Sequence, residues 1–154
     1  MDKPILTVMC GIQGSGKSTY SKALAEVTNA TIFSSDELRI ELFGDVYEQG
    51  RNDELFRELR KRIKDCLKSG HNAVWDSTNV SAEKRKSFLK EIEDIDCYKR
   101  CVIMKTPFLQ CIKNNNNRDR TLPVEVIQRT YTKFQEPTKT EGFNEITTVY
   151  NIDI

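Results

Sequence analysis

The sequence of 154 residues predicts a doubly wound α/β fold, in which a mostly parallel five-stranded sheet carries helices on both faces. Short apolar, strand-like runs alternate with helix-like stretches, and this alternation indicates crossover connections between parallel strands. The strand-like runs are residues 5–10, 30–34, 72–76, 97–104 and 146–152. The chain length and the lack of an internal repeat or linker favour one domain, 1–154.

The first strand-like run leads directly into a glycine-rich loop, residues 11–18, with the spacing Gly-x-x-x-x-Gly-Lys-Ser/Thr of a phosphate-binding loop (P-loop). Glycines let the backbone curl around phosphate oxygens, and a following helix adds the positive end of its dipole. A helix-like run does follow, from Thr19 to Val27. We expect Lys17 to reach the β and γ phosphates of ATP or another nucleoside triphosphate, and Ser18 to hold Mg²⁺. The predicted nucleotide contacts are Gly11, Gly14, Ser15, Gly16, Lys17, Ser18 and Thr19.

Two carboxylates follow the second and third strands, at Asp36 and Asp76. Ligands of doubly wound sheets sit outside the carboxyl ends of the strands, so both side chains should flank the same cleft as Lys17. An ionised carboxylate can orient an attacking hydroxyl and accept its proton, a role that suits Asp36. Arg39 lies one turn further along the same helix face and would point into the acceptor pocket. The competing interpretation of this segment is a helix cap, with Glu37 completing a capping box.

The helix predicted over residues 51–68 has one apolar face and one basic face. Its apolar residues are Leu55, Leu59, Ile63, Cys66 and Leu67, and the helix should end at Gly70. Seven basic and four acidic residues occupy the rest of this stretch. The pattern leaves two interpretations open, a solvated helix with internal ion pairs or a surface that contacts a phosphate backbone.

Later helices are indicated at 81–92 and from Thr106-Pro107, with Pro107 at the first helical position. Residues 114–122 are rich in asparagine and should form an irregular lid, because asparagine side chains compete for the backbone. A helix restarts at Leu122-Pro123, and Pro137 should end it. Arg118 and Arg120 in the lid could close over the triphosphate and stabilise charge on the transferring group. A plain basic loop is the alternative.

The charge balance, the cysteines and the apolar runs limit the classes of protein to which this chain can belong. Lys and Arg number 24 and Asp and Glu number 23, so any surface for nucleic acid must be local. Five cysteines without a Cys-x-x-Cys pair indicate reduced core thiols in a cytoplasmic protein. Neither a signal peptide nor a run of membrane-spanning length is present, so we expect no membrane partner.

The order of motifs resembles the kinase domains of bacteriophage and bacterial polynucleotide 5′-kinases, from Ile5 to about Val149. The motifs are Gly-x-x-Gly-Ser-Gly-Lys-Ser-Thr, Ser-Asp-x-x-Arg, Asp-Ser-Thr-Asn, Arg-Asp-Arg-x-x-Pro-x-x-Val-Ile and Glu-Gly-Phe-Asn-Glu-Ile. The resemblance implies a P-loop kinase fold and transfer of the ATP γ-phosphate to a 5′-hydroxyl end of RNA or DNA in nucleic-acid repair. It also implies that a separate phosphatase or ligase could act in the same pathway.

Individual roles follow from the same resemblance. It implies catalytic roles for Lys17, Asp36 as general base, and Arg118 or Arg120 as the lid arginine. Arg39 would contact the acceptor phosphate next to the 5′-nucleoside. The implied substrate-binding set is Arg39, Asp76, Thr78 and Asn79.

Two other functions remain open. The same P-loop, base and lid would serve a kinase acting on a small-molecule hydroxyl, such as a nucleoside, sugar or antibiotic, because only the acceptor pocket differs. A nucleotide-binding regulatory or scaffold module is the third possibility, and the presence of Lys17, Ser18 and Asp36 together argues against it.

Overall fold

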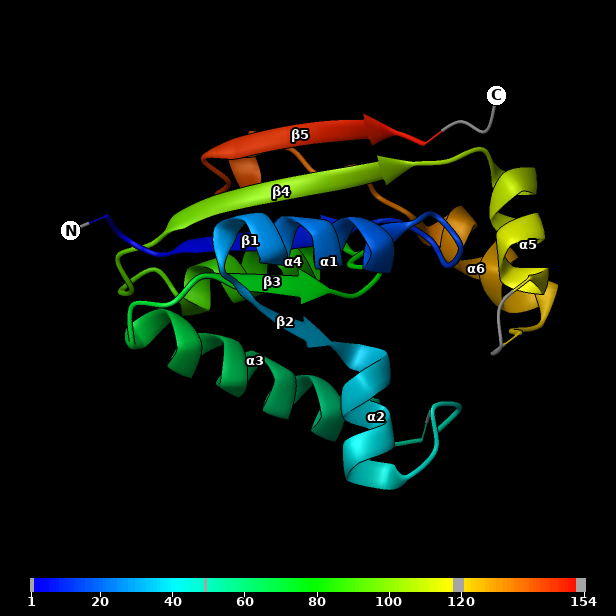
Figure 1. The fold of residues 1–154 in the computed structure, drawn as a ribbon, viewed down its shortest axis with the longest axis horizontal. Coiled ribbons are helices and arrows are strands. Elements are labelled where there is room, and N and C mark those ends of the chain that lie inside the picture. The colour runs from blue at the N-terminus through cyan, green and yellow to red at the C-terminus, as the bar shows by residue number, and fades with distance from the viewer. Residues whose placement is uncertain (1, 49, 118–120, 152–154) are drawn as a thin grey trace.

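Five parallel strands form one sheet in the order β2-β3-β1-β4-β5 (Figure 1). The computed structural model of the protein describes residues 2–48, 50–117 and 121–151. The strands are β1 (Ile5–Cys10), β2 (Thr31–Ser34), β3 (Ala73–Asp76), β4 (Tyr98–Lys105) and β5 (Glu145–Tyr150). The predicted parallel α/β fold is confirmed, with each strand within two residues of its expected position at either end.

The helices occupy the connections between these strands. They are α1 (Lys17–Thr28), α2 (Ser35–Phe43), α3 (Asn52–Lys68), α4 (Ala82–Glu91), α5 (Phe108–Asn116), α6 (Val124–Lys133) and the 3₁₀ helix η1 (Lys139–Glu141). Figure 1 shows α1 across one face of the sheet, α4 behind it, and α5 and α6 beyond the arrowheads of the strands. The loops at this carboxyl end are therefore where a ligand of a doubly wound sheet is expected.

The central strands β1 and β3 are buried on both faces, as expected in a parallel sheet. Leu6, Val8 and Cys10 of β1 point to the side covered by α3 and α4, where they join one large apolar cluster. Met9 points to the opposite side, where Tyr20 and Leu24 of α1 pack against its cluster. The alternation along β1 thus fixes which layer each helix joins.

The amphipathic pattern of α3 is confirmed. Its residues Leu55, Leu59, Ile63 and Leu67 are buried, and Cys66 is half-buried. On the opposite face Arg62 pairs with Glu58 and Glu41. Arg60 and Lys64 both pair with Glu91 of α4. These ion pairs favour the solvated-helix interpretation over a dedicated phosphate-binding face.

The asparagine-rich segment differs from its prediction, because Asn114 and Asn115 lie in the last turn of α5 and do not belong to an irregular lid. Asn115 is fully buried, and its amide closes two hydrogen bonds with the backbone of Leu122, one from Nδ2 to the carbonyl (2.8 Å) and one from the Leu122 N–H (3.1 Å). Such tertiary bonds offset the competition of asparagine side chains for their own helix.

Two helix ends also differ from their predictions. Pro107 precedes the first residue of α5 and serves as its N-cap, with an extended ψ of 139°. Helix α6 ends at Lys133, because Phe134 adopts an extended conformation well before Pro137. Both differences move an element boundary and leave the order of elements unchanged.

The five cysteines are all free, and four of them are buried. The Sγ atoms of Cys10 and Cys101 approach to 3.6 Å on neighbouring strands. Burial raises the pKa of the Cys10 thiol well above its usual range. Within the described ranges, no helix combines the length and the apolar character needed to cross a bilayer.

Candidate active site

The P-loop begins where β1 ends and turns directly into α1. Gly14 and Gly16 both have positive φ, at 80° and 96°, a region that glycine adopts without strain. A Cβ atom on Gly14 would lie 2.3 Å from the carbonyl oxygen of Cys111, and one on Gly16 would lie 2.8 Å from Asn151 Nδ2. The glycines of the motif are thus required by the packing around the loop as well as by its conformation.

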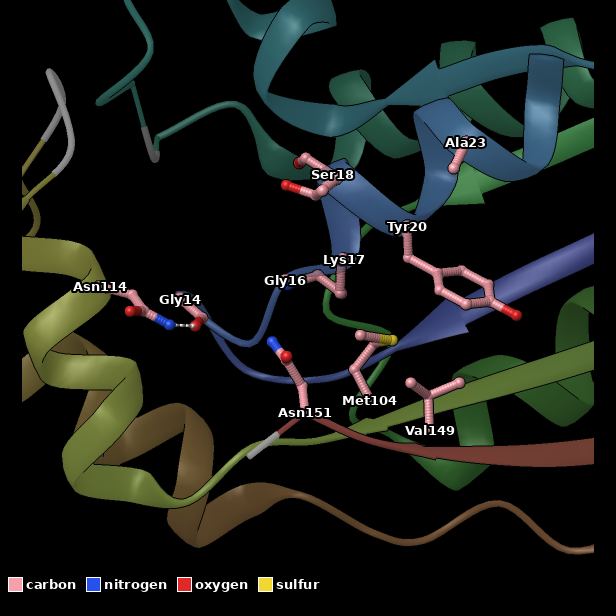
Figure 2. Close-up of a pocket in the computed structure, with 11 residues that line it drawn as sticks. Gly14, Gly16, Lys17, Ser18, Tyr20, Ala23, Met104, Asn114, Val149 and Asn151 are labelled. Carbon is pink, nitrogen blue, oxygen red and sulfur yellow. Dashed lines mark hydrogen bonds between the residues drawn. The ribbon is translucent and has the colours of Figure 1, made fainter. Parts of the chain in front are cut away.

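Three side chains hold the loop from outside, and the sequence motifs did not include them. Thr106 Oγ1 and Asn151 Nδ2 donate to the Ser15 carbonyl at 2.7 and 3.2 Å. Asn114 Nδ2 donates to the Gly14 carbonyl at 2.9 Å (Figure 2). These bonds come from segments about 90 to 140 residues away in sequence and fix the curled shape of the loop.

Ser15, which the sequence predicts as a nucleotide contact, makes a hydrogen bond within the P-loop. Its N–H donates to the Ile12 carbonyl at 3.2 Å, and its fully buried hydroxyl has no hydrogen-bond partner among the described residues.

A cavity of about 570 Å³ opens beside the loop, and the predicted residues Gly14, Gly16 and Lys17 line it. Its apolar wall consists of Tyr20, Ala23, Met104 and Val149 (Figure 2). The predicted residues Ser18 and Thr19 also line it. This hollow is large enough for one small ligand.

Ser18 and Asp76 meet at the carboxyl end of the sheet. The Ser18 hydroxyl in the first turn of α1 donates to Asp76 Oδ2 at 2.9 Å, and Asp76 is the last residue of β3. Lys17 Nζ donates to the Ile12 carbonyl at 3.0 Å, so its ammonium lies over the loop. A hydroxyl and a carboxylate are oxygen ligands of the kind that Mg²⁺ takes together with nucleotide phosphates. These residues therefore fit a magnesium nucleotide.

Cys111 lies directly behind this loop and stays uncharged. Burial raises the pKa of its thiol to about 11, although the nearby Lys17 acts in the opposite direction. A neutral thiol at this position does not compete with phosphate for the lysine ammonium.

A second cavity, of about 590 Å³, brings most of the predicted catalytic and acceptor residues together. Lys17, Ser18, Asp36, Arg39, Asp76 and Thr78 all line it. Asp36 reaches it from the first turn of α2, whose N-cap Ser34 accepts a hydrogen bond from the Glu37 N–H at 3.3 Å. The predicted N-cap bond is therefore present, and it coexists with a carboxylate in the cavity. We refer to this hollow as the acceptor cavity.

Arg39 is more firmly held than its sequence context indicates. Its guanidinium donates to Asp36 Oδ1 (3.2 Å), to the Glu48 carbonyl (3.1 Å) and to Asn52 Oδ1 (2.9 Å). The side chain is 9% exposed, while that of Asp36 is 45% exposed. In this arrangement Arg39 positions the Asp36 carboxylate and leaves it open to the cavity.

The turn after β3 carries two further predicted residues. The Thr78 carbonyl accepts a hydrogen bond from the Gly11 N–H at 3.0 Å, which joins this turn to the start of the P-loop. Asn79 has a positive φ of 48°, and its side-chain amide donates to the Met9 carbonyl at 2.8 Å. Thr78 lines the acceptor cavity, whereas the Asn79 amide is bonded to β1.

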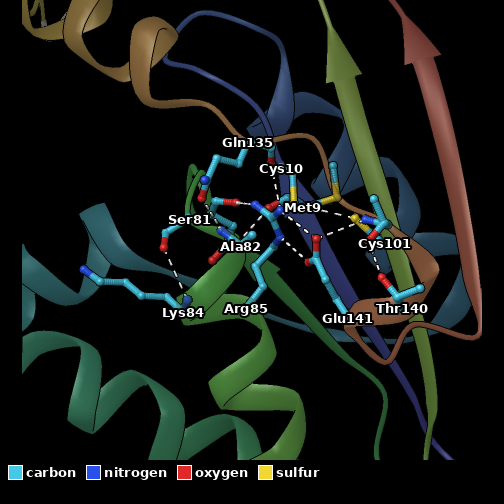
Figure 3. A network of polar contacts seen from close by, with 12 residues as sticks. Met9, Cys10, Ser81, Ala82, Lys84, Arg85, Cys101, Gln135, Thr140 and Glu141 are labelled. Carbon is cyan, nitrogen blue, oxygen red and sulfur yellow. Dashed lines mark hydrogen bonds and ion pairs between the residues drawn. The ribbon is translucent and has the colours of Figure 1, made fainter.

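A buried ion pair supports the same turn (Figure 3). Arg85 Nε donates to Glu141 Oε1 at 2.7 Å, and both side chains are 2% exposed. The same guanidinium donates to the carbonyls of Asn79 (2.7 Å) and Gln135 (2.8 Å). Arg85 therefore ties together the turn after β3, the segment after α6 and η1.

Helix α6 contributes acceptor-cavity residues that the motifs did not include. Val126, Arg129 and Thr130 follow the i, i+3, i+4 spacing of one helix face, and all three line the cavity. Gln13 of the P-loop donates to Thr130 Oγ1 at 3.1 Å. Helical periodicity after Pro123 was the available sequence signal. The predicted lid arginines, Arg118 and Arg120, lie outside the described residues.

The fold and these two cavities define a P-loop domain with the architecture of the nucleotide-dependent kinases. The family comparison agrees, and the chain belongs to a family described as an AAA domain, whose model matches residues 6–137.

Two curated relatives match most of the chain at low identity. The chain is 28% identical over 137 residues to L-seryl-tRNA(Sec) kinase of Methanococcus maripaludis, covering 86% of this chain and 53% of that protein. It is 27% identical over 145 residues to a protein of Autographa californica nuclear polyhedrosis virus named as a bifunctional polynucleotide kinase/RNA ligase, covering 84% and 20%. The chain thus spans about half of the first relative and a fifth of the second.

Solved structures support the fold. The Pnkp1/Rnl/Hen1 RNA repair complex contains a chain with a TM-score of 0.76 and 19% identity, covering 86% of this chain and 44% of that one. A gluconokinase from Sinorhizobium meliloti 1021 gives a TM-score of 0.67 and 17% identity, covering 97% and 84%. The same architecture therefore occurs in proteins whose names point to different acceptors.

Proposed function

We propose that this chain is an ATP-dependent polynucleotide kinase that transfers the γ-phosphate of ATP to the 5′-hydroxyl end of RNA or DNA. One observation carries the proposal: a partly exposed carboxylate, Asp36, lines the same cavity as the P-loop residues Lys17 and Ser18. Phosphoryl transfer requires this combination of a charged phosphate cradle and a base that faces the acceptor.

The donor side is assigned from the P-loop and the hollow beside it. ATP would place its phosphates in the P-loop near Lys17, and its base in the hollow walled by Tyr20 and Val149. Ser18 and Asp76 would hold Mg²⁺, which supplies charge neutralisation for the transferring phosphoryl group. The positive end of α1 adds to the attraction for the phosphates.

On the acceptor side, Asp36 orients the attacking hydroxyl and takes its proton as the new P–O bond forms. Arg39 holds this carboxylate in place through the 3.2 Å bond between the guanidinium and Oδ1. The proton moves from the hydroxyl oxygen to an Asp36 oxygen. The bond between the γ-phosphorus and the oxygen that bridges it to the β-phosphate breaks, and that oxygen leaves with ADP. Arg118 or Arg120 would supply positive charge from the segment outside the described residues.

A polynucleotide acceptor is favoured over a neutral small molecule for two reasons. The acceptor cavity has three cationic side chains, Lys17, Arg39 and Arg129, and two carboxylates, Asp36 and Asp76, so its lining attracts anions. The names of both curated relatives also specify a nucleic acid or an aminoacylated one. The alternative, a small-molecule hydroxyl, rests on the size of the cavity, which suits a single small ligand.

An acceptor panel separates these functions. ADP release from ATP and Mg²⁺ would be measured with a 5′-hydroxyl RNA oligonucleotide, the matching DNA oligonucleotide, a seryl-tRNA, a free nucleoside and gluconate. The proposal expects release with the oligonucleotides, and release that falls as salt rises because several phosphates are contacted. Release with the nucleoside or gluconate alone would establish the small-molecule function instead.

A further inference from the structure

We infer that Arg129 binds a phosphate of the acceptor, and that this chain therefore selects acceptors with a negatively charged linkage next to the reacting hydroxyl. The inference rests on the proposed function and deepens it by naming the residue that distinguishes a nucleotide chain from a neutral hydroxyl compound. No motif in the sequence assigned Arg129.

The placement of Arg129 is fixed by the helix that carries it. Val126, Arg129 and Thr130 form one face of α6, and this face lines the acceptor cavity together with Asp36. The bond from Gln13 Nε2 to Thr130 Oγ1 holds this face against the P-loop. Ile127 on the adjacent face is fully buried and packs with Ile12 and Cys111. The part of α6 that carries Arg129 is therefore held in place by a polar contact at Thr130 and an apolar contact at Ile127.

Among the described residues that line the acceptor cavity, Arg129 has the charge most available for an anionic acceptor. Arg129 is exposed and makes no hydrogen bond or ion pair with any other residue in the described ranges. Arg39, the residue expected to contact the acceptor phosphate, is 9% exposed and already donates to three oxygen atoms. Lys17 lies over the P-loop, where the donor phosphates are expected. Arg129 is thus the cation of this cavity best able to meet an incoming phosphate.

The guanidinium group suits this task chemically. It offers paired N–H donors that match two phosphate oxygens. The same cavity offers a place for the attached nucleoside, since Tyr47 also lines it, is 49% exposed and has an aromatic ring on which a base can stack. A linkage bound by Arg129 would hold the terminal hydroxyl near Asp36 without any contact that reads the base sequence.

The test compares two 5′-hydroxyl dinucleotides that differ only in the linkage, which is either a phosphodiester or an uncharged methylphosphonate. The wild-type protein should prefer the phosphodiester by roughly 10- to 100-fold in kcat/KM, because a hydrogen-bonded ion pair is lost with the other acceptor. Arg129→Ala should remove this preference and leave the Kd for ATP unchanged, and Arg129→Lys should keep part of it. Lys86→Ala, which removes an exposed charge from α4, should behave like wild type.

The outcomes are distinguishable. If wild type transfers phosphate to neither dinucleotide nor to longer 5′-hydroxyl oligonucleotides, the proposed function fails. If wild type transfers phosphate but shows no preference for the phosphodiester, or if Arg129→Ala keeps the preference, the assignment of Arg129 is overturned and the kinase function stands. An equal loss of ATP affinity in Arg129→Ala would also overturn it, because the guanidinium would then bind the donor.

Discussion

The Ser18 hydroxyl donates a 2.9 Å hydrogen bond to the Asp76 carboxylate and so joins the P-loop to the end of β3, 58 residues away in sequence. The two strands that lead to these residues are paired in the centre of the sheet, with Val8 opposite Trp75. This pairing places a hydroxyl and a carboxylate where a magnesium nucleotide would need them.

Loss of the Asp76 carboxylate should raise the Mg²⁺ requirement. In Asp76→Asn the amide can still accept the Ser18 hydroxyl, but its negative charge is gone. We expect the Mg²⁺ concentration for half-maximal transfer to rise by about 10-fold or more. A magnesium titration at saturating ATP measures this, and an unchanged midpoint would remove Asp76 from the metal site.

Replacement of Asp36 should stop transfer without weakening ATP binding. Asp36→Ala removes the group that accepts the hydroxyl proton, and we expect kcat to fall by about 100-fold or more. Glu37→Gln is the matched control, because Glu37 is the exposed neighbour and does not line the cavity. Equal losses in the two variants, or a parallel loss of ATP affinity in Asp36→Ala, would contradict the role of base.

A comparison of Gly14 in the P-loop with Gly44, the C-cap of α2, separates the effect of close packing from that of backbone strain. Gly14 and Gly44 have similar positive φ values, 80° and 71°, but a Cβ on Gly44 meets nothing within 4 Å while one on Gly14 meets the Cys111 carbonyl at 2.3 Å. Gly44→Ala should cost about 1–2 kcal/mol from backbone strain alone. Gly14→Ala should cost more and abolish ATP binding. Equal stability and equal ATP affinity of the two variants would show that the predicted clash is absent.

The buried Arg85–Glu141 pair should dominate the stability of the turn after β3. Arg85→Met leaves the buried Glu141 charge unpaired and the Asn79 and Gln135 carbonyls without the guanidinium, so the free energy of unfolding should fall by about 3–5 kcal/mol.

The matched control for this pair is Arg62→Met. Its ion pairs are exposed, with the Arg62 side chain 37% accessible, so its loss should change stability by less than about 1 kcal/mol. Urea unfolding measures both variants. A similarly small effect for Arg85→Met would mean that the pair contributes little to the fold.

The sequence predicted the elements whose signals are local. Apolar runs located the strands, and the spacing of glycine, lysine and serine located the P-loop. Asp36 could be chosen because it follows a strand, and the carboxyl ends of parallel strands meet at one edge of the sheet.

The remaining parts depend on contacts between distant segments. The asparagine-rich pattern predicts that Asn114 lies in an irregular lid, but its amide donates to the Gly14 carbonyl, 100 residues away, and Asn114 lies in α5. The spacing from Asp36 predicts that Arg39 points into the acceptor pocket, but the Glu48 carbonyl and Asn52 Oδ1, from the next loop and helix, accept hydrogen bonds from its guanidinium. Arg129 carries no local motif, and the packing of α6 against Ile12, together with the Gln13–Thr130 hydrogen bond, brings it to the cavity.

The most direct test of the central claim is transfer of labelled γ-phosphate from ATP, with Mg²⁺, to a short 5′-hydroxyl oligonucleotide, run beside the same oligonucleotide already 5′-phosphorylated. The proposed function predicts label on the hydroxyl form only, and loss of that label in Asp36→Ala but not in Glu37→Gln. Absence of label on the hydroxyl form, in a protein that still binds ATP, would contradict the assignment of this chain as a polynucleotide kinase.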